Sequence, residues 1–419
     1  MLEVMKIAIL GYGLEGKSAL KFLKKQYQKA DFIIRDIKRQ GKDYLKNLEN
    51  FDTIVRSPGI PYLSPQIQKA KKHEVKITSA TKLFLENTDA KIIGVTGSYG
   101  KSTTATLIYK LLKAGGLNAF LVGNIGKPAI EILPKLKKNS VIVLELSSFQ
   151  LQGLDFSPNT AVVLDISPAH LDHHKSFKEY LMAKSNIARF QKERDKIFYF
   201  GNSHNSSWVS NTGNGKKIPV SVDNFNFFSP NDLIMVGEHN FKNAVIAFFA
   251  ASDLGINNKI LLKTIKSFKG LEHRLNLVSN TSEVSFYNDS ASVTPEATLA
   301  ALKAFNQKKI LIAGGLGRNL NYKILSKAID KDDVKSTILL GENKNQIASF
   351  AKEKAKLKLV STLEQAVKAA SSVARPGDVV LFSPGSASFD MFGSYKERGR
   401  IFVDLVKKLK ARKNSSGTP

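Results

Sequence analysis

Short apolar runs alternate with amphipathic stretches over the first 88 residues. Residues 6–10, 32–34 and 53–55 are short enough to be buried strands, and residues 14–28 carry apolar side chains at helical spacing. This strand–helix–strand order predicts a parallel sheet that is covered by helices.

The same order recurs further along the chain. A strand, a loop and a helix are predicted over residues 91–112, and buried strands follow at 141–144 and 161–164. Residues 201–230 are rich in Asn, Ser and Gly, a composition that favours loops and short strands.

A third series of strands and helices begins after Gly270. Its predicted strands are residues 284–287, 309–313, 336–340 and 379–382. A last helix is predicted at 388–409, followed by a basic tail, 410–419, that we expect to fray. The pattern therefore predicts an α/β protein of three domains, at residues 1–88, 89–270 and 271–419.

Length and composition agree with this division. A chain of 419 residues corresponds to three domains of about 150 residues. With 42% hydrophobic and 24% charged residues, the composition is that of a soluble globular protein. The absence of cysteine excludes disulfides, thiolate catalysis and zinc–thiolate sites.

The formal charge of +27 has two readings, a nucleic-acid partner or a lysine-rich surface. Many lysines are dispersed over predicted helices, for example Lys21, Lys24, Lys25, Lys352, Lys354, Lys356 and Lys358. Because dispersed charges form no binding stripe, we favour the surface reading and expect no nucleic-acid partner. The chain also shows neither a secretory leader pattern nor an apolar run of about 18 residues, so we expect a cytoplasmic protein without membrane insertion.

The first glycine loop, residues 11–16, follows a predicted strand and opens a helix, and Asp36 lies 20 residues after Gly16. This arrangement is the dinucleotide fingerprint, in which glycines admit a pyrophosphate to the helix N-terminus. A second small loop, residues 56–59, would end at the same crevice. On the residues alone, NAD, another phosphorylated nucleotide and mere tight packing all remain open.

The second glycine loop is more specific. Thr96-Gly97-Ser98-Tyr99-Gly100-Lys101-Ser102-Thr103 lies between a predicted strand and a helix. Backbone N–H groups of such a loop surround phosphates, the lysine neutralises their charge, and the serine hydroxyl can bind Mg²⁺. The strict form would have glycine where Val95 stands. We predict an ATP site, with a chance glycine-rich turn as the alternative.

Acids and histidines follow the strands next to this loop. Glu145 ends a predicted strand, where a Mg²⁺ ligand belongs. His170, His173 and His174 follow another strand. Three histidines could also indicate zinc, but such a cluster without further ligand spacing is more often a solvated turn.

Taken together, these motifs resemble the Mur ligase family. The matching segments are residues 11–16, 97–103, 123–126, 145–150, 170–172, 180–184, 237–243, 271–274, 288–290 and 383–390. Their order and spacing hold over about 400 residues. The string Glu-Leu-Ser-Ser-Phe-Gln-Leu at 145–151 looks most like the glutamate-adding members.

The resemblance implies an N-terminal Rossmann-like domain that binds a UDP sugar, a central P-loop ATPase domain with a mostly parallel sheet, and a C-terminal Rossmann-like domain that binds the amino acid. The activity implied is ATP-dependent ligation through an acyl phosphate. ATP, Mg²⁺, UDP-N-acetylmuramoyl-L-alanine and D-glutamate are the implied cofactors and small-molecule substrates, and a monomer is expected.

Site residues are carried over position by position. The UDP-sugar site would comprise Leu14, Glu15, Asp36, Ser57, Gly59, Asn124 and Ser147. The ATP site would comprise Gly97, Ser98, Tyr99, Gly100, Lys101, Ser102, Thr103, Asn240, Asn243, Arg274 and Asp289. Metal ligands would be Ser102, Glu145, His170 and a carbamylated Lys184, and D-glutamate would contact Arg318, Ser388 and Tyr395. Lys101, His170 and Lys184 are the implied catalytic residues. A carbamate suits a hard cation, which an ammonium would repel.

Several positions depart from the family pattern. Tyr99 stands where asparagine is usual, Ala169 where an acid often precedes the histidine, and Arg318 where a lysine is expected. Ala291 and Val293 replace a lysine and a threonine. These changes concern the amino-acid contacts more than the activation by ATP.

Three rival functions stay open at this stage. A sister ligase or a folate polyglutamate ligase would use another amino acid, although the chain lacks the Asp-Asn-Pro-Arg string of one sister. An NAD-dependent oxidoreductase would depend on the first loop alone. A non-catalytic nucleotide-binding regulator would release no phosphate with any acceptor.

Overall fold

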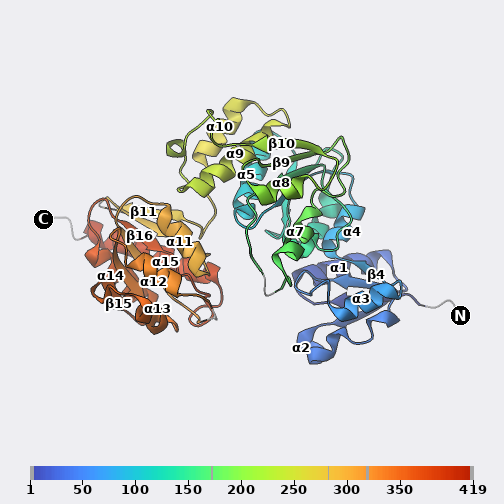
Figure 1. Cartoon of the computed structure of the whole chain (residues 1–419), viewed down its shortest axis with the longest axis horizontal. Coiled ribbons are helices and arrows are strands. Elements are labelled where there is room, and N and C mark those ends of the chain that lie inside the picture. Colours follow the sequence, from blue (N-terminus) through green and yellow to red (C-terminus); the bar gives the residue numbers. More distant parts are fainter. Residues whose placement is uncertain (1–3, 171–172, 282, 318–319, 416–419) are drawn as a thin grey trace. The chain divides into compact units, whose positions relative to one another are not determined.

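The computed structural model describes residues 4–170, 173–281, 283–317 and 320–415 (Figure 1). The chain forms two compact units. The first runs to Phe228 and includes Lys242–Ile265, and the second takes Ser229–Phe241 and continues from Lys266. Three largely parallel sheets confirm the predicted α/β class. In the described ranges, no helix is long and apolar enough to cross a membrane.

The first sheet has the order β2-β1-β3-β4, and its strands are all parallel. The strands are β1 (Lys6–Leu10), β2 (Asp31–Arg35), β3 (Thr53–Arg56) and β4 (Lys76–Thr78), with helices α1 (Leu14–Gln26), α2 (Ile37–Gln40), α3 (Pro65–Lys72) and α4 (Ala80–Glu86). Side chains alternate between the two faces of a strand, so Ile7 and Ile9 enter one apolar cluster while Ala8 and Leu10 enter another. A strand buried on both faces reads as a continuous apolar run, which is why it was predictable.

The central sheet has the order β10-β9-β8-β5-β7-β6, again parallel throughout. Its strands are β5 (Lys91–Thr96), β6 (Ala119–Gly123), β7 (Val141–Glu145), β8 (Thr160–Val163), β9 (Lys196–Phe200) and β10 (Lys216–Val220). The helices are α5 (Lys101–Ala114), α6 (Ser148–Leu151), α7 (Phe177–Ser185), α8 (His204–Ser210), α9 (Glu238–Ser252) and α10 (Asn258–Ser267). Because β7 and β8 lie on opposite sides of β5, the loops after these three strands meet at the switch point of the sheet, where ligands bind in open α/β sheets.

The third sheet has the order β11-β12-β16-β13-β14-β15, with β11 antiparallel at one edge. Its strands are β11 (Asn276–Thr281), β12 (Val284–Asn288), β13 (Lys309–Ala313), β14 (Val334–Leu339), β15 (Leu357–Leu359) and β16 (Val379–Phe382). Its helices are α11 (Pro295–Lys303), α12 (Lys323–Ile329), α13 (Lys344–Phe350), α14 (Leu363–Val373) and α15 (Tyr395–Ser415). Leu311 and Ala313 face one apolar cluster, and Ile310 and Ile312 face the other.

Two predicted elements were wrong. The last helix begins at Tyr395 instead of 388, and it continues to Ser415, into the tail that we expected to fray. Helix α8 lies within the segment that was predicted to be loops and strands. There the hydroxyl of Ser206 donates to the Leu164 carbonyl and that of Ser210 donates to the Ser206 carbonyl, so side chains that favour turns are buried and satisfied within a helix. The division into three domains stays a prediction.

Arg56, at the end of β3, joins the first sheet to helix α6, which follows β7. Its side chain is buried, and its guanidinium donates to the carbonyls of Ile60 at 2.8 Å, Phe149 at 2.8 Å and Gln152 at 2.9 Å, with a longer contact to Pro58. Burial lowers the pKa of Arg56 to about 10, which still leaves it charged at neutral pH. The fork therefore holds together two chain segments about 90 residues apart in sequence.

We expect Arg56→Met to lower the free energy of unfolding of the first unit by about 2–4 kcal/mol, because the carbonyls that it binds would stay buried without donors. Urea denaturation followed by circular dichroism would measure the change. Arg39→Met is the control, because Arg39 is exposed and its guanidinium stacks on the Tyr12 ring at 5.0 Å, and it should cost less than about 1 kcal/mol. Equal losses in both variants would contradict the role of Arg56.

Candidate active site

The phosphate loop connects β5 to α5 and depends on two glycines. Gly100 has a φ of +80°, and a Cβ there would lie 2.4 Å from Oδ1 of Asn243. A Cβ on Gly97 would lie 2.6 Å from Cβ of Leu164. No other residue fits such close approaches, so the loop can present its backbone only with glycine at both positions.

Ser98 and Lys101 fix the shape of this loop. The Ser98 hydroxyl donates to the Ser167 carbonyl at 2.8 Å, accepts from the Ser167 N–H at 2.9 Å and lies 2.9 Å from the Tyr180 hydroxyl. Lys101 Nζ donates to the carbonyls of Gly97 at 3.0 Å and Ser98 at 2.9 Å. The ammonium therefore lies over the loop, where it can neutralise a phosphate. Tyr99, by contrast, is 62% exposed.

Lys184 on α7 points into the same place. Its side chain is 1% exposed, and its Nζ donates to the Gly97 carbonyl at 2.8 Å and contacts Oγ1 of Thr96 at 3.2 Å. Burial lowers the pKa of Lys184 well below that of a free lysine, the nearby Lys101 lowers it further, and Glu145 partly opposes both. The lowered pKa favours the neutral amine, which is the form that reacts with carbon dioxide to give a carbamate.

Glu145 at the end of β7 supplies the acid of the site. It is 1% exposed, and its Oε1 accepts from Nδ2 of Asn124 at 2.9 Å. Its Oε2 is buried with no hydrogen-bond partner among the residues that the structure describes, which is costly for a carboxylate unless a cation binds it. This orphaned oxygen fits a Mg²⁺ ligand.

The histidine turn packs against Phe149, which follows Glu145 on the chain, and Tyr180, on the helix that carries Lys184. His170 is exposed with a φ of +55°, and its ring lies 5.0 Å from that of Phe149 and 6.4 Å from that of Tyr180. In the part of the chain that the structure describes, no three His, Asp or Glu side chains converge as metal ligands. A cation bound by Glu145 and His170 would need a further donor, which a carbamate on Lys184 would provide. Ser102 lies in the first turn of α5 and Thr103 is buried there.

The first glycine loop brings together most of the predicted UDP-sugar residues. Asp36 accepts from the N–H groups of Tyr12 at 2.6 Å and Lys38 at 2.9 Å, and the bond to Tyr12 is the main reason that the pKa of Asp36 is lowered. The Ser57 hydroxyl donates to the Gly11 carbonyl at 2.8 Å, next to Gly59. Leu14 projects from the loop and is 75% exposed.

Hydrogen bonds through Gln150 tie this loop to Ser147, a UDP-sugar residue predicted in the central domain. Nε2 of Gln150 donates to Oε1 of Glu15 at 2.7 Å, while Oε1 of Gln150 accepts from the N–H of Ser147 at 3.0 Å. Burial raises the pKa of Glu15, and the bond from Gln150 partly opposes this. Glu15 and Ser147, both predicted UDP-sugar residues, are thus linked through Gln150, which the sequence reasoning missed.

The second unit holds the other predicted contacts. Asp289 is buried and accepts from the hydroxyls of Ser292 at 2.6 Å and Ser383 at 2.7 Å. Burial raises the pKa of Asp289 to about 6, against these bonds and the charge of Arg274. Asn240 donates to the Val236 carbonyl at 2.8 Å and belongs to this unit, whereas Asn243 belongs to the first.

The loops predicted to bind D-glutamate are held by two residues that the sequence reasoning missed. Asn343 accepts from the Gly315 N–H at 2.9 Å and donates to the Ser386 hydroxyl at 2.8 Å. Arg398, 2% exposed, donates to the carbonyls of Ser290, Ser386 and Ala387. No sequence signal marks either residue, because one lies in a charged helix and the other in a polar turn.

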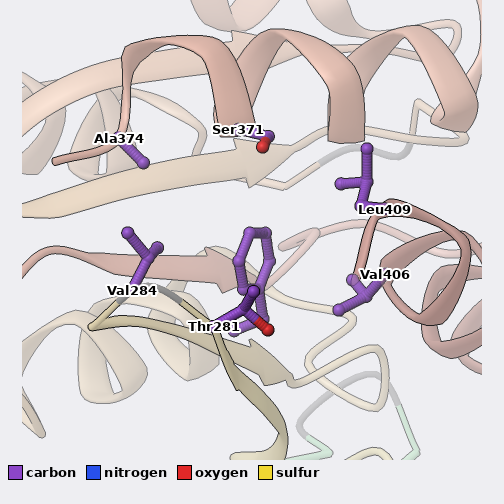
Figure 2. A pocket seen from close by; sticks show the side chains of 7 residues that line it. Thr281, Val284, Ser371, Ala374, Val406 and Leu409 are labelled. Carbon is purple, nitrogen blue, oxygen red and sulfur yellow. The ribbon is translucent and has the colours of Figure 1, made fainter. Parts of the chain in front are cut away.

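The predicted glutamate contacts themselves are only partly described. Ser388 is buried and Tyr395 is 36% exposed at the start of α15, where its carbonyl accepts from Ser290. Arg318 lies outside the described residues. A separate hollow between β11, β12, α14 and α15 offers no charged group (Figure 2). It is lined by Thr281, Val284, Phe286, Ser371, Ala374, Val406 and Leu409.

Solved structures share this architecture. The MurF ligase of Thermotoga maritima in complex with ADP has a TM-score of 0.62 at 16% identity, covering 98% of this chain and 96% of that one. The UDP-N-acetylmuramate–alanine ligase MurC of the same organism has a TM-score of 0.61 at 19% identity, covering 97% of this chain and 100% of that one. At such identities the likeness shows the fold alone.

Sequence relatives are closer. A UDP-N-acetylmuramoylalanine–D-glutamate ligase of Acetivibrio thermocellus is 36% identical, with 97% of each chain covered. A ligase of the same name from Clostridium botulinum is 33% identical, and the match covers 97% of this chain and 98% of that ligase. The Mur ligase middle domain matches residues 95–227, and the Mur ligase, glutamate ligase domain matches residues 273–385. The chain therefore belongs to the Mur ligase family.

Proposed function

We propose that the protein is an ATP-dependent ligase that joins D-glutamate to the alanyl carboxylate of UDP-N-acetylmuramoyl-L-alanine in the synthesis of peptidoglycan precursors. The observation that carries this proposal is the identity of 36% over 97% of the chain to a ligase named for that reaction. The phosphate loop, with Lys101, Lys184 and Glu145 gathered around it, supports the use of ATP.

The reaction has two chemical steps. The alanyl carboxylate oxygen attacks the γ-phosphorus of ATP, ADP leaves, and an acyl phosphate forms. The D-glutamate amine then attacks the acyl carbon, and the tetrahedral intermediate collapses with loss of phosphate and a proton. Lys101 would stabilise the charge on the transferred phosphoryl group, as a cation held in advance over a phosphate loop does.

Mg²⁺ would be held by Ser102, Glu145, His170 and Lys184 as a carbamate. The unpartnered, buried Oε2 of Glu145 and the lowered pKa of Lys184 support this assignment. When bound, the ion would supply Lewis-acid stabilisation of phosphate oxygens. The chain's own residues would orient the carboxylate and exclude water, which would otherwise hydrolyse the acyl phosphate.

The remaining predicted residues would bind the substrates. Leu14, Asp36 and Ser57 would contact the UDP part of the sugar nucleotide. The UDP-sugar site would also include Glu15, Gly59, Asn124 and Ser147. Asn240, Asn243, Arg274 and Asp289 would contact ATP. For D-glutamate, the planar fork of Arg318 suits a carboxylate, and Ser388 with the backbone near Tyr395 would take the second one. Because ATP and UDP sugars are cytoplasmic metabolites, we propose a cytoplasmic enzyme, acting as a monomer.

The proposed function predicts that phosphate is released only when ATP, Mg²⁺, UDP-N-acetylmuramoyl-L-alanine and D-glutamate are all present. A phosphate-release assay with a panel of amino acids, including L-glutamate and L-alanine, would measure this. Turnover with another amino acid in place of D-glutamate would favour a sister ligase. A titration that shows binding of NADH but not of the UDP sugar would favour an oxidoreductase.

Lys101→Ala should lower kcat by at least about 100-fold, since the loss of a charge held against a transferring phosphoryl group costs a few kcal/mol of transition-state stabilisation. Lys113→Ala, on the exposed side of the same helix, is the matched control and should keep kcat within about twofold. A loss of less than tenfold in folded Lys101→Ala would refute the assignment of the phosphate loop.

Lys184 should carry a carbamate at neutral pH in bicarbonate, because its lowered pKa favours the neutral amine more than the pKa of an exposed lysine does. Below the folded-state pKa the amine is protonated again, so the carbamate should disappear as the pH falls. Carbon-13 NMR with labelled bicarbonate would follow the signal. Lys184→Ala should abolish it, while Lys178→Ala, exposed on the same helix, should not. An identical spectrum for Lys184→Ala would contradict the prediction.

A further inference from the structure

His174 is a wholly buried imidazole that lies behind the candidate metal site. Its side chain is 0% exposed. Nε2 lies 2.9 Å from Oγ of Ser148, itself 2% exposed, and Nδ1 lies 3.4 Å from Oε1 of Glu179, longer than an ordinary hydrogen bond. The Phe149 ring stacks on the imidazole at 5.4 Å, and the Tyr180 ring meets it edge-on at 5.3 Å.

The partners of His174 select one tautomer. A carboxylate can only accept, so the proton of the neutral imidazole belongs on Nδ1, towards Glu179, and Nε2 accepts from the Ser148 hydroxyl. Glu179 is itself held, because its Oε1 accepts from Nε2 of Gln152 at 2.8 Å and its Oε2 accepts from the N–H of Lys175 at 2.9 Å. The result is a directed line of polar contacts from serine through histidine to glutamate.

This line connects the elements that carry the predicted metal ligands. Ser148 begins α6, three residues after Glu145. Glu179 lies on α7, which also carries Lys184. The backbone N–H of His174 donates to the His170 carbonyl at 2.9 Å. Contacts of His174, made by its ring and by its backbone N–H, thus reach the segments of all three.

A second contact reaches the phosphate loop. The Tyr180 ring, which packs against His174, lies 4.8 Å from Nζ of Lys184, and the Tyr180 hydroxyl lies 2.9 Å from Oγ of Ser98. His174 therefore supports the side chain that spans α7 and the loop. Since it is fully buried, it has no surface to offer a substrate, so any effect on the reaction must act through these neighbours.

We propose that His174 is a positioning residue, which through Ser148 and Glu179 holds Glu145, His170 and Lys184 in the arrangement that binds the cation and the transferred phosphoryl group. This inference rests on the proposed function. Polar partners behind metal ligands orient those ligands, and their loss typically costs 10- to 100-fold in metal affinity or activity. A merely structural histidine would instead affect stability alone.

Two variants test the proposal. His174→Phe keeps a ring of similar size but removes both polar contacts, and Ser148→Ala removes one. We expect kcat to fall about 10- to 100-fold in His174→Phe and about 3- to 10-fold in Ser148→Ala, with the KM values for D-glutamate and the UDP sugar within about threefold. The carbamate signal of Lys184 in labelled bicarbonate should weaken more in His174→Phe than in Ser148→Ala. This measurement does not depend on turnover of substrate.

Ser210→Ala is the matched control, because Ser210 is equally buried and its hydroxyl donates to a helix carbonyl away from this line. It should lose stability but keep kcat and the carbamate signal. Wild-type kcat and carbamate in Ser148→Ala would overturn the proposal, even if His174→Phe fails to fold. If the wild-type protein shows no turnover with D-glutamate, the proposed function fails, and the carbamate signal alone then decides the role of His174.

Discussion

Burial of charged groups where β5, β7 and β8 end is the constraint on which the site depends. Glu145 and Lys184 are each 1% exposed, so neither keeps the hydration that would stabilise its charge. The two respond differently: burial holds the pKa of Lys184 well below that of a free lysine, while Oε2 of Glu145 has no hydrogen-bond partner among the described residues. Both features would raise the free energy of the empty site, and a bound cation and phosphate would offset that cost. The parallel sheet makes this possible, because its strand ends are enclosed by loops from both sides of β5.

Elsewhere in the chain, buried cations are stabilised mainly by backbone carbonyls. Arg56 and Arg398 each donate to carbonyls of several segments, and Lys309 combines a carbonyl with the carboxylate of Asp333 at 2.8 Å. A guanidinium has five donors in a rigid fork, so one side chain can fix several chain segments at once. The excess of positive charge is therefore mostly a property of the surface, whereas these few buried cations determine how loops are held.

The buried imidazole of His174 also contacts several chain segments, but as a neutral group. Its Nε2 is within hydrogen-bond distance of the Ser148 hydroxyl, its Nδ1 faces the Glu179 carboxylate at 3.4 Å, and the rings of Phe149 and Tyr180 enclose it on other sides. Polar contacts in a low-dielectric interior are stronger than in water, which is why they can hold neighbouring elements in register. The catalytic chemistry that we propose depends on that register, because the Glu145, His170 and Lys184 side chains come from three separate segments of the chain.

The sequence by itself determined the interior strands and the place of the glycine loop between β5 and α5. β1, β13 and β16 have the predicted bounds, because a strand covered on both faces must be a continuous apolar run, and the loop was predictable because a strand, glycines and a helix follow one another locally; that the loop binds ATP stays a prediction. The sequence could not predict helix α8 or the start of α15, and it gave no sign that Arg56, Gln150 or His174 would be buried between segments. Those features depend on partners tens of residues away, such as the Leu164 carbonyl for Ser206 and the Phe149 carbonyl for Arg56. Only the tertiary structure decides them, because a polar side chain is stable inside a protein when a distant partner satisfies it, and local pattern does not record where that partner lies.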